Sequence, residues 1–216
     1  MNAIVQLLKK EIIIEWRQRY ALNGMLLQVL SSVFVVYLSV KVLNQNTWNG
    51  VFWVVMLFIS INAIAKSFIG ESKGRNIYYH MLVQPQQLLL AKFIYNAILN
   101  ILLSILCLSA FAIFMGNPIQ SFSLFLLVTM MGCIGFAATF TMLSAISSKA
   151  GGSNLLMPVL SLPVIIPLLL IIIKASKRAL DGLDNSLILK DLGVLLIFNV
   201  LVIVLAYILF PSLWKE

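Results

Sequence analysis

No charged side chain interrupts residues 93–148, which read FIYNAILNILLSILCLSAFAIFMGNPIQSFSLFLLVTMMGCIGFAATFTMLSAISS. As one α-helix, these 56 residues would extend roughly 84 Å, whereas the hydrocarbon core of a bilayer is about 30 Å thick. The stretch therefore has to fold back. Gly116-Asn117-Pro118 marks the turn, because glycine and asparagine tolerate unusual dihedral angles and proline ends a helix. The stretch predicts a hairpin of two membrane-spanning helices, 93–115 and 122–148.

Four further charge-free intervals flank this hairpin, each near the length of about 20 residues that a spanning helix needs. They are residues 21–40, 48–65, 155–173 and 192–213. The composition agrees with a bilayer location, since 62% of the 216 residues are hydrophobic and only 10% are charged. The sequence therefore predicts an all-α membrane protein with six transmembrane helices.

Basic residues are unequally shared between the two ends of the predicted bundle. With the N-terminus in the cytoplasm, ten lie inside: Lys9, Lys10, Arg17, Arg19, Lys66, Lys73, Arg75, Lys92, Lys149 and Lys215. Five lie outside: Lys41, Lys174, Lys177, Arg178 and Lys190. Because cytoplasmic loops carry the excess of basic residues, both termini are predicted inside. The periplasmic loop 174–190 is a counter-signal, because it holds four of the outer five.

The net charge of +8 could suggest nucleic-acid binding. The basic residues lie between apolar segments, however, and form no dense patch with interleaved aromatic residues. Membrane orientation explains the charge better, and no nucleic-acid partner is expected.

Residues 1–20 place Val5, Leu8, Ile12 and Trp16 at helical spacing, with charged residues on the remaining face. This pattern predicts an amphipathic helix in the cytoplasmic interface that turns into the first span at Asn23-Gly24. It fits a simple membrane anchor as well as an elbow that positions the domain.

The cytoplasmic loop 66–92, KSFIGESKGRNIYYHMLVQPQQLLLAK, is too long for a turn. It mixes charged side chains with apolar and aromatic ones: Glu71, Lys73 and Arg75 with Ile77, Tyr78, Tyr79, Met81 and Leu82. Pro85 should stop a helix that starts near Gly74, which predicts a short helix with an apolar face. Docking of a soluble protein is favoured over a helix lying on lipid, because tyrosine and methionine are enriched at protein interfaces.

Three prolines, Pro158, Pro163 and Pro167, lie in the fifth span. Each removes a backbone donor and allows a kink. They predict a span that bends for gating or for packing, and both uses remain open.

Polar residues recur at helical spacing on the first and third spans: Gln28, Ser32, Ser39, Asn96, Asn100 and Ser104. They are expected to face protein or a cavity. Hydrogen bonds between helices are the first explanation, and a substrate path is the alternative.

Other chemistry is poorly supported by the sequence. Cys107 and Cys133 lie in apolar stretches without metal-ligand spacing and are expected to be reduced packing residues. His80 lies in the predicted cytoplasmic loop without a second ligand, so a solvated histidine is favoured over a heme ligand. The chain has no GxxxxGK[ST] phosphate loop and no catalytic set, so it is not expected to be an enzyme or to bind a cofactor directly.

Taken together, three segments resemble the heme exporter protein B family, CcmB. They are LLKKEIIIEWRQRYALNG at residues 7–24, the loop with Gly74, Pro85 and the exit Leu90-Ala91-Lys92, and AGGSNLLMPVLSLPVIIPLLL at residues 150–170. The last is the most specific, because the family similarly has a glycine-bearing loop that runs into a leucine- and proline-rich fifth span.

The resemblance implies an ABC-2 type (type II exporter) permease in the bacterial inner membrane. Its expected partners are a separate cytosolic ABC ATPase, other cytochrome c maturation membrane subunits, a heme chaperone, membrane lipid and a second permease copy. ATP would act through the partner, and heme is the candidate substrate. By this analogy Glu71, Gly74, Arg75, Tyr79, Leu82 and Pro85 would form the coupling element for the ATPase.

Two other functions remain open at this stage. A permease for drugs, lipids or polysaccharide would share the six-span architecture, because a fold does not fix a substrate. A membrane scaffold that assembles a maturation complex without transport is the third interpretation.

Overall fold

Every element of the described chain is a helix. The computed structural model describes residues 3–17, 19–40, 44–69, 83–149 and 156–215. The helices are α1 (Ala3–Arg17), α2 (Arg19–Ser39), α3 (Gln45–Ile64), α4 (Lys66–Ile69), α6 (Pro85–Met115), α7 (Phe122–Lys149), α8 (Leu156–Leu180) and α9 (Asn185–Lys215). Six of them, α2, α3, α6, α7, α8 and α9, are long and apolar enough to cross a bilayer, which confirms the predicted six-span class.

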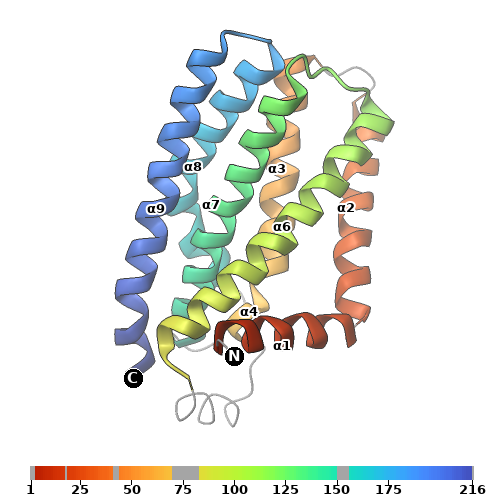
Figure 1. The fold of residues 1–216 in the computed structure, drawn as a ribbon. Helices are drawn as coiled ribbons and strands as arrows, with labels where there is room; N and C mark the ends of the chain where they lie inside the picture. The colour runs from red at the N-terminus through yellow and green to blue at the C-terminus, as the bar shows by residue number, and fades with distance from the viewer. Residues whose placement is uncertain (1–2, 18, 41–43, 70–82, 150–155, 216) are drawn as a thin grey trace.

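The spanning helices form one bundle with α7 at its centre (Figure 1). Helix α7 packs against α3, α4, α6, α8 and α9, whereas α2 lies at the edge against α6 and α3. Helix α6 crosses the bundle diagonally, and α1 lies across one end of it. Both described termini lie at this end, which we call the N-terminal end of the bundle.

The core between α3, α6 and α7 is built from aromatic side chains. Trp48 stacks on Phe52 with ring centroids 5.6 Å apart, and Phe111 meets both rings edge-on. Offset and edge-to-face contacts are the favourable geometries for such rings. Phe125 of α7 also meets the Trp48 ring edge-on, so these aromatic contacts hold the three helices together.

The turn predicted in the middle of the charge-free stretch is confirmed. Helix α6 ends at Met115, and Gly116 follows with φ of +78°. Residues with a Cβ rarely adopt this backbone conformation, so glycine is the residue suited to the position. Helix α7 then begins at Phe122 and runs antiparallel to α6.

Several helices are longer than the charge-free intervals that predicted them. Helix α6 begins at Pro85 instead of residue 93, and α8 continues to Leu180, so most of the predicted loop 174–190 is helical. Only residues 181–184 separate α8 from α9. A charge-free interval measures the part of a helix that lies in hydrocarbon, and a helix can continue past it where its charges are paired or reach water.

One local prediction was wrong. The chain does not turn at Asn23-Gly24, because α2 is helical from Arg19 onward and includes both residues. Pro85 is the first residue of α6, where its missing N–H costs no intrahelical hydrogen bond. The helix predicted from Gly74 falls on residues 70–82, outside the described part of the chain.

Candidate functional site

The N-terminal end of the bundle brings together α1, α4 and the start of α6 (Figure 1). Of the residues predicted to couple to an ATPase, Pro85 lies here as the first residue of α6. The others, Glu71, Gly74, Arg75, Tyr79 and Leu82, lie outside the described residues, as does His80. The chain leaves the described region after Ile69 of α4 and returns at Val83. Both ends of the loop therefore lie at this end of the bundle.

Lys92 of α6 joins these elements. It is only 1% exposed, an unusual burial for a lysine. Its Nζ lies 3.4 Å from Glu11 Oε1 of α1 and donates a hydrogen bond to the Ser67 carbonyl of α4. The same ammonium lies 4.8 Å from the centre of the Phe68 ring. A buried cation needs partners of this kind, and Lys92 has them on two other helices.

Asn96, one turn further along α6, extends these contacts to α7. Its Nδ2 donates to Ser67 Oγ at 3.1 Å and to Thr141 Oγ1 at 2.8 Å. The prediction that Asn96 bonds to another helix is therefore confirmed. We call Glu11, Ser67, Phe68, Lys92 and Asn96 the Lys92 cluster.

The break between α3 and α4 is held from the side of α7. The Ser144 hydroxyl donates to the Ala65 carbonyl at 3.1 Å and accepts from the Phe68 backbone N–H at 3.4 Å. The Phe68 ring also packs on Phe210 of α9, with centroids 5.5 Å apart. Helix α4 is short, but contacts from α6, α7 and α9 fix its position.

Two glutamates of helix α1, Glu11 and Glu15, are partly buried against the bundle. Burial alone raises the pKa of the Glu11 carboxyl, but the charges of Lys92 and Lys10 and their hydrogen bonds outweigh burial and lower that pKa below its ordinary value. Burial, the largest effect, raises the pKa of Glu15, and a hydrogen bond from Tyr95 offsets part of this rise. Glu11 is therefore held ionised next to its two lysines.

The apolar side chains predicted to share one face of α1 mostly point away from the bundle. Val5 and Ile12 are about half exposed, and Trp16 is 72% exposed. Leu7, in contrast, is buried in a second apolar cluster with Phe68, Leu88 and Phe210. Helix α1 thus has one face held by the protein and another that is open to lipid or a partner.

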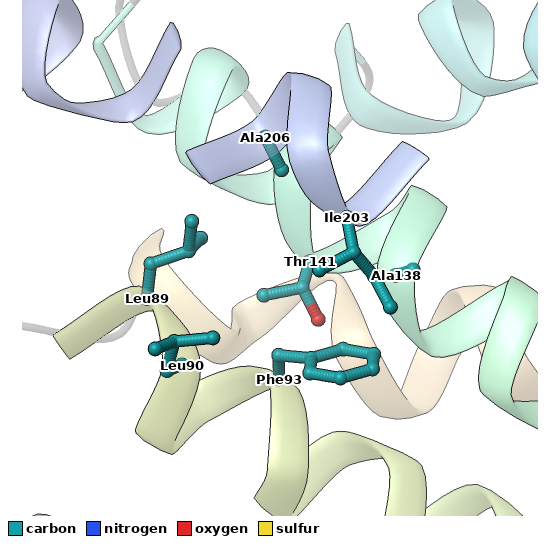
Figure 2. A pocket seen from close by; sticks show the side chains of 7 residues that line it. All are labelled: Leu89, Leu90, Phe93, Ala138, Thr141, Ile203 and Ala206. Atoms are coloured by element: carbon teal, nitrogen blue, oxygen red, sulfur yellow. The ribbon is translucent and has the colours of Figure 1, made fainter. Parts of the chain in front are cut away.

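A small crevice lies between α6, α7 and α9 (Figure 2), and its lining residue Thr141 accepts the hydrogen bond from Asn96. It is lined by Leu89, Leu90, Phe93, Ala138, Thr141, Ile203 and Ala206. Its cavity volume is about 10 Å³, close to the space of one water molecule. The crevice is therefore too small for a ligand the size of heme.

The three prolines of α8 do not break this helix. Pro158 lies in its first turn, while Pro163 and Pro167 lie within it, both on the exposed side. Their rings therefore do not pack in the core of this chain. Bending of α8, for gating or for packing, stays a prediction.

A second polar cluster joins α3 to α8 toward the opposite end. Trp53 Nε1 donates to Ser176 Oγ at 2.8 Å, and the Ser176 hydroxyl lies 2.9 Å from Asn49 Oδ1. Beyond it, Arg178 of α8 pairs with Asp191 of α9 at 2.7 Å. These contacts tie α8 to its neighbours and involve no titrating group in the bilayer centre.

The residues at the centre of the Lys92 cluster were missed in the sequence. Lys92 marked the edge of a charge-free run, and Glu11 was assigned to the charged face of an interfacial helix. One signal in the sequence could have revealed this ion pair. Proline often begins a helix, so a helix that starts at Pro85 places Lys92 two turns further along, inside the bundle. A lysine buried there needs an acidic partner. Ser39 was expected to face protein, but it is exposed and bonds to the Val35 carbonyl of its own helix.

The fold defines a multi-pass all-α membrane protein with six candidate spans. The family model described as CcmB protein matches residues 2–210, so the chain belongs to the CcmB family. No match was found among curated proteins. Members of the CcmB family are the heme exporter permeases of the cytochrome c maturation ABC transporter. The permease is non-catalytic and works with a separate ATPase, CcmA.

Proposed function

We propose that this permease couples ATP hydrolysis in its ATPase partner to the handling of heme, or of a heme-loaded chaperone, at the periplasmic face of the bacterial inner membrane. The N-terminal end of the bundle is the cytoplasmic end, and the chain between α4 and α6 contacts the ATPase. The observation that carries this proposal is the gathering of α1, α4, the start of α6 and both ends of the loop around Lys92. A motor can move the bundle only through an element that is firmly joined to it.

Charge supports this orientation. Among the lysines and arginines that the structure describes, eight belong to the N-terminal end and four to the opposite end. At the opposite end, Asp191 pairs with Arg178 at 2.7 Å and approaches Lys174 at 3.9 Å. The basic residues that formed the counter-signal in the sequence are thus partly neutralised within the bundle.

The outward face of α1 supports a lipid contact at the same end. Val5, Ile12 and Trp16 are exposed on it, and Lys9 and Arg17 are exposed beside them. Such a helix suits the interface of a bilayer, with its apolar side chains in the lipid and its cations at anionic headgroups. In this arrangement other maturation subunits, the heme chaperone and a second permease copy would meet the chain through its spans and its periplasmic end.

Charge reversal in the loop tests the docking surface. The double variant Glu71→Lys and Arg75→Glu should reduce the amount of ATPase that co-purifies with the permease from detergent-solubilised membranes. The matched control is Asp184→Lys with Lys190→Glu, which reverses the same charges at exposed positions of the opposite end. Loss of ATPase binding in the control alone would place the contact at the wrong end and refute the proposal.

Deletion of the gene followed by heme staining of periplasmic cytochromes tests the cargo. The proposed function requires c-type cytochromes to be lost and to return with the wild-type gene. An ATPase-dead partner should give the same loss. Normal staining in the deletion strain would refute the heme function altogether.

A further inference from the structure

Side chains of α6 join this helix to α4 at the N-terminal end of the bundle. Ser67 of α4 lies three residues before residue 70, and Lys92 lies in the third turn of α6. The Lys92 ammonium donates to the Ser67 carbonyl, and Asn96 donates to the Ser67 hydroxyl at 3.1 Å. Helices α4 and α6, which precede and follow residues 70–82 in the chain, are therefore joined directly.

The same ammonium also holds α1. Glu11 Oε1 lies 3.4 Å from Lys92 Nζ, and the Glu11 side chain is only 16% exposed. Lys10 pairs with the same oxygen at 2.8 Å, but its side chain is more exposed, at 26%. Among the contacts of the described residues, Lys92 joins the base of the loop to α1, whereas the bond from Lys10 to Glu11 stays within α1.

We propose that Lys92 is a positioning residue for energy coupling, which holds the base of the loop at Ser67 and helix α1 at Glu11 with one buried ammonium. A force on the loop then moves α1 and α6 together instead of bending α4 alone. This inference rests on the proposed function and names the residue that transmits the motion. It does not require Lys92 to touch the ATPase or heme.

The chemistry of a lysine suits this role. Its ammonium has three donors on a long stem, so one group can bond a carbonyl and a carboxylate on different helices. A neutral amide at this position could keep one contact, but it could not neutralise Glu11. Removal of one partner from a buried ion pair leaves the other charge uncompensated. Loss of the Lys92 charge should therefore weaken the contact between α1 and α6.

The test compares Lys92→Gln and Glu11→Gln with Lys10→Gln in the complex of permease and ATPase. Three quantities are measured: the ATPase that co-purifies, the ATP hydrolysis rate of the purified complex, and the heme-stained cytochrome c in cells that carry it. Lys92→Gln should retain the ATPase and its hydrolysis rate but lower the cytochrome yield. We expect a loss of about fivefold or more, because fivefold is the lower end of the coupling usually found between two sites. Glu11→Gln should act in the same direction, since it breaks the link to α1.

Lys10→Gln is the matched control, because it removes a cation from the same carboxylate through an ion pair that lies within α1. It should leave the yield near wild type, and Lys92→Arg should recover most of the yield lost in Lys92→Gln. A wild-type yield in Lys92→Gln would overturn the inference, as would an equal loss in Lys10→Gln. A loss of ATPase binding that accounts for the whole drop in yield would also overturn it, since Lys92 would then be merely structural.

If Lys92→Gln does not accumulate in the membrane, Glu11→Gln decides the question by the same criteria, because its side chain lies nearer the surface. The two proposals fail in different ways. A wild-type permease that never retains the ATPase refutes the proposed function and the inference with it. Normal ATPase binding with normal yield in both glutamine variants refutes the inference alone.

Discussion

Gly135 of α7 lies in close contact with both α8 and α9. A Cβ at this position would lie 2.6 Å from Asn199 Oδ1 and 2.9 Å from Leu168 Cδ2. Asn199 cannot easily move away, because its Nδ2 donates to the Met131 carbonyl at 3.0 Å. We expect Gly135→Ala to destabilise the bundle by about 1–3 kcal/mol, as overpacking does in other cores. The measurement is the midpoint of thermal unfolding in detergent, which should fall.

Gly193 of α9 provides the control for this prediction. An added Cβ there meets no atom within 4 Å. Alanine is the better helix former, by about 1 kcal/mol. Gly193→Ala should therefore leave the unfolding midpoint unchanged or raise it slightly. Equal midpoints for the two variants would show that the contact at Gly135 relaxes without cost.

The difference between Asn96 and Lys92 shows how far the sequence reaches at the residue scale. Asn96 was assigned to helix–helix hydrogen bonding because an amide in a span has few alternatives, and it bonds to Thr141. Lys92 was treated as the end of an apolar run, because its partner Glu11 lies 81 positions earlier in the chain. An ion pair between Lys92 and Glu11 forms only if α1 packs against the start of α6. No local pattern in the sequence encodes this packing.

At the scale of elements, the sequence predicted which segments cross the membrane better than it predicted where helices end. The six spans follow from apolar length, which is a direct physical requirement of the bilayer. Helix α8 nevertheless continues seven residues beyond Ile173, through Lys174, Lys177 and Arg178. The ion pair between Arg178 and Asp191 stabilises this extension, and it forms only once α9 packs beside α8.

Proline substitutions in α8 test whether this helix bends during transport. Pro163 and Pro167 lie on the exposed side, so replacing them with alanine should cost no packing within the chain. The double variant regains backbone donors in the helix interior and should unfold at a higher temperature. If bending is used in transport, the cytochrome yield should nevertheless fall severalfold. An unchanged yield would contradict a gating role.

Pro158 is the control for the two interior prolines. It lies in the first turn of α8, where backbone N–H groups have no intrahelical partner. Pro158→Ala should therefore alter neither the unfolding temperature nor the yield. A drop in yield with Pro158→Ala would indicate that the start of α8 contributes for a reason other than helix stiffness.

On the scale of the whole molecule, the bundle has two chemically different ends. One carries α1, both described termini and the buried Lys92 cluster. The other has the short turn at 116–121 and the turn at 181–184, with the ion pairs of Asp191 close by. Because an even number of spans returns the chain to its starting side, one measurement at each end fixes the orientation of every loop.

Reporter fusions provide these measurements. Alkaline phosphatase needs disulfides that form in the periplasm but not in the cytoplasm, so its activity reports the side on which it lies. A fusion to the C-terminus should be inactive, and a fusion to the chain truncated after Asp184 should be active. The expected result follows from the basic residues gathered at the N-terminal end. The reverse pattern would put loop 66–92 in the periplasm, out of reach of any ATP-driven subunit, and the Lys92 cluster could not then transmit force from a motor.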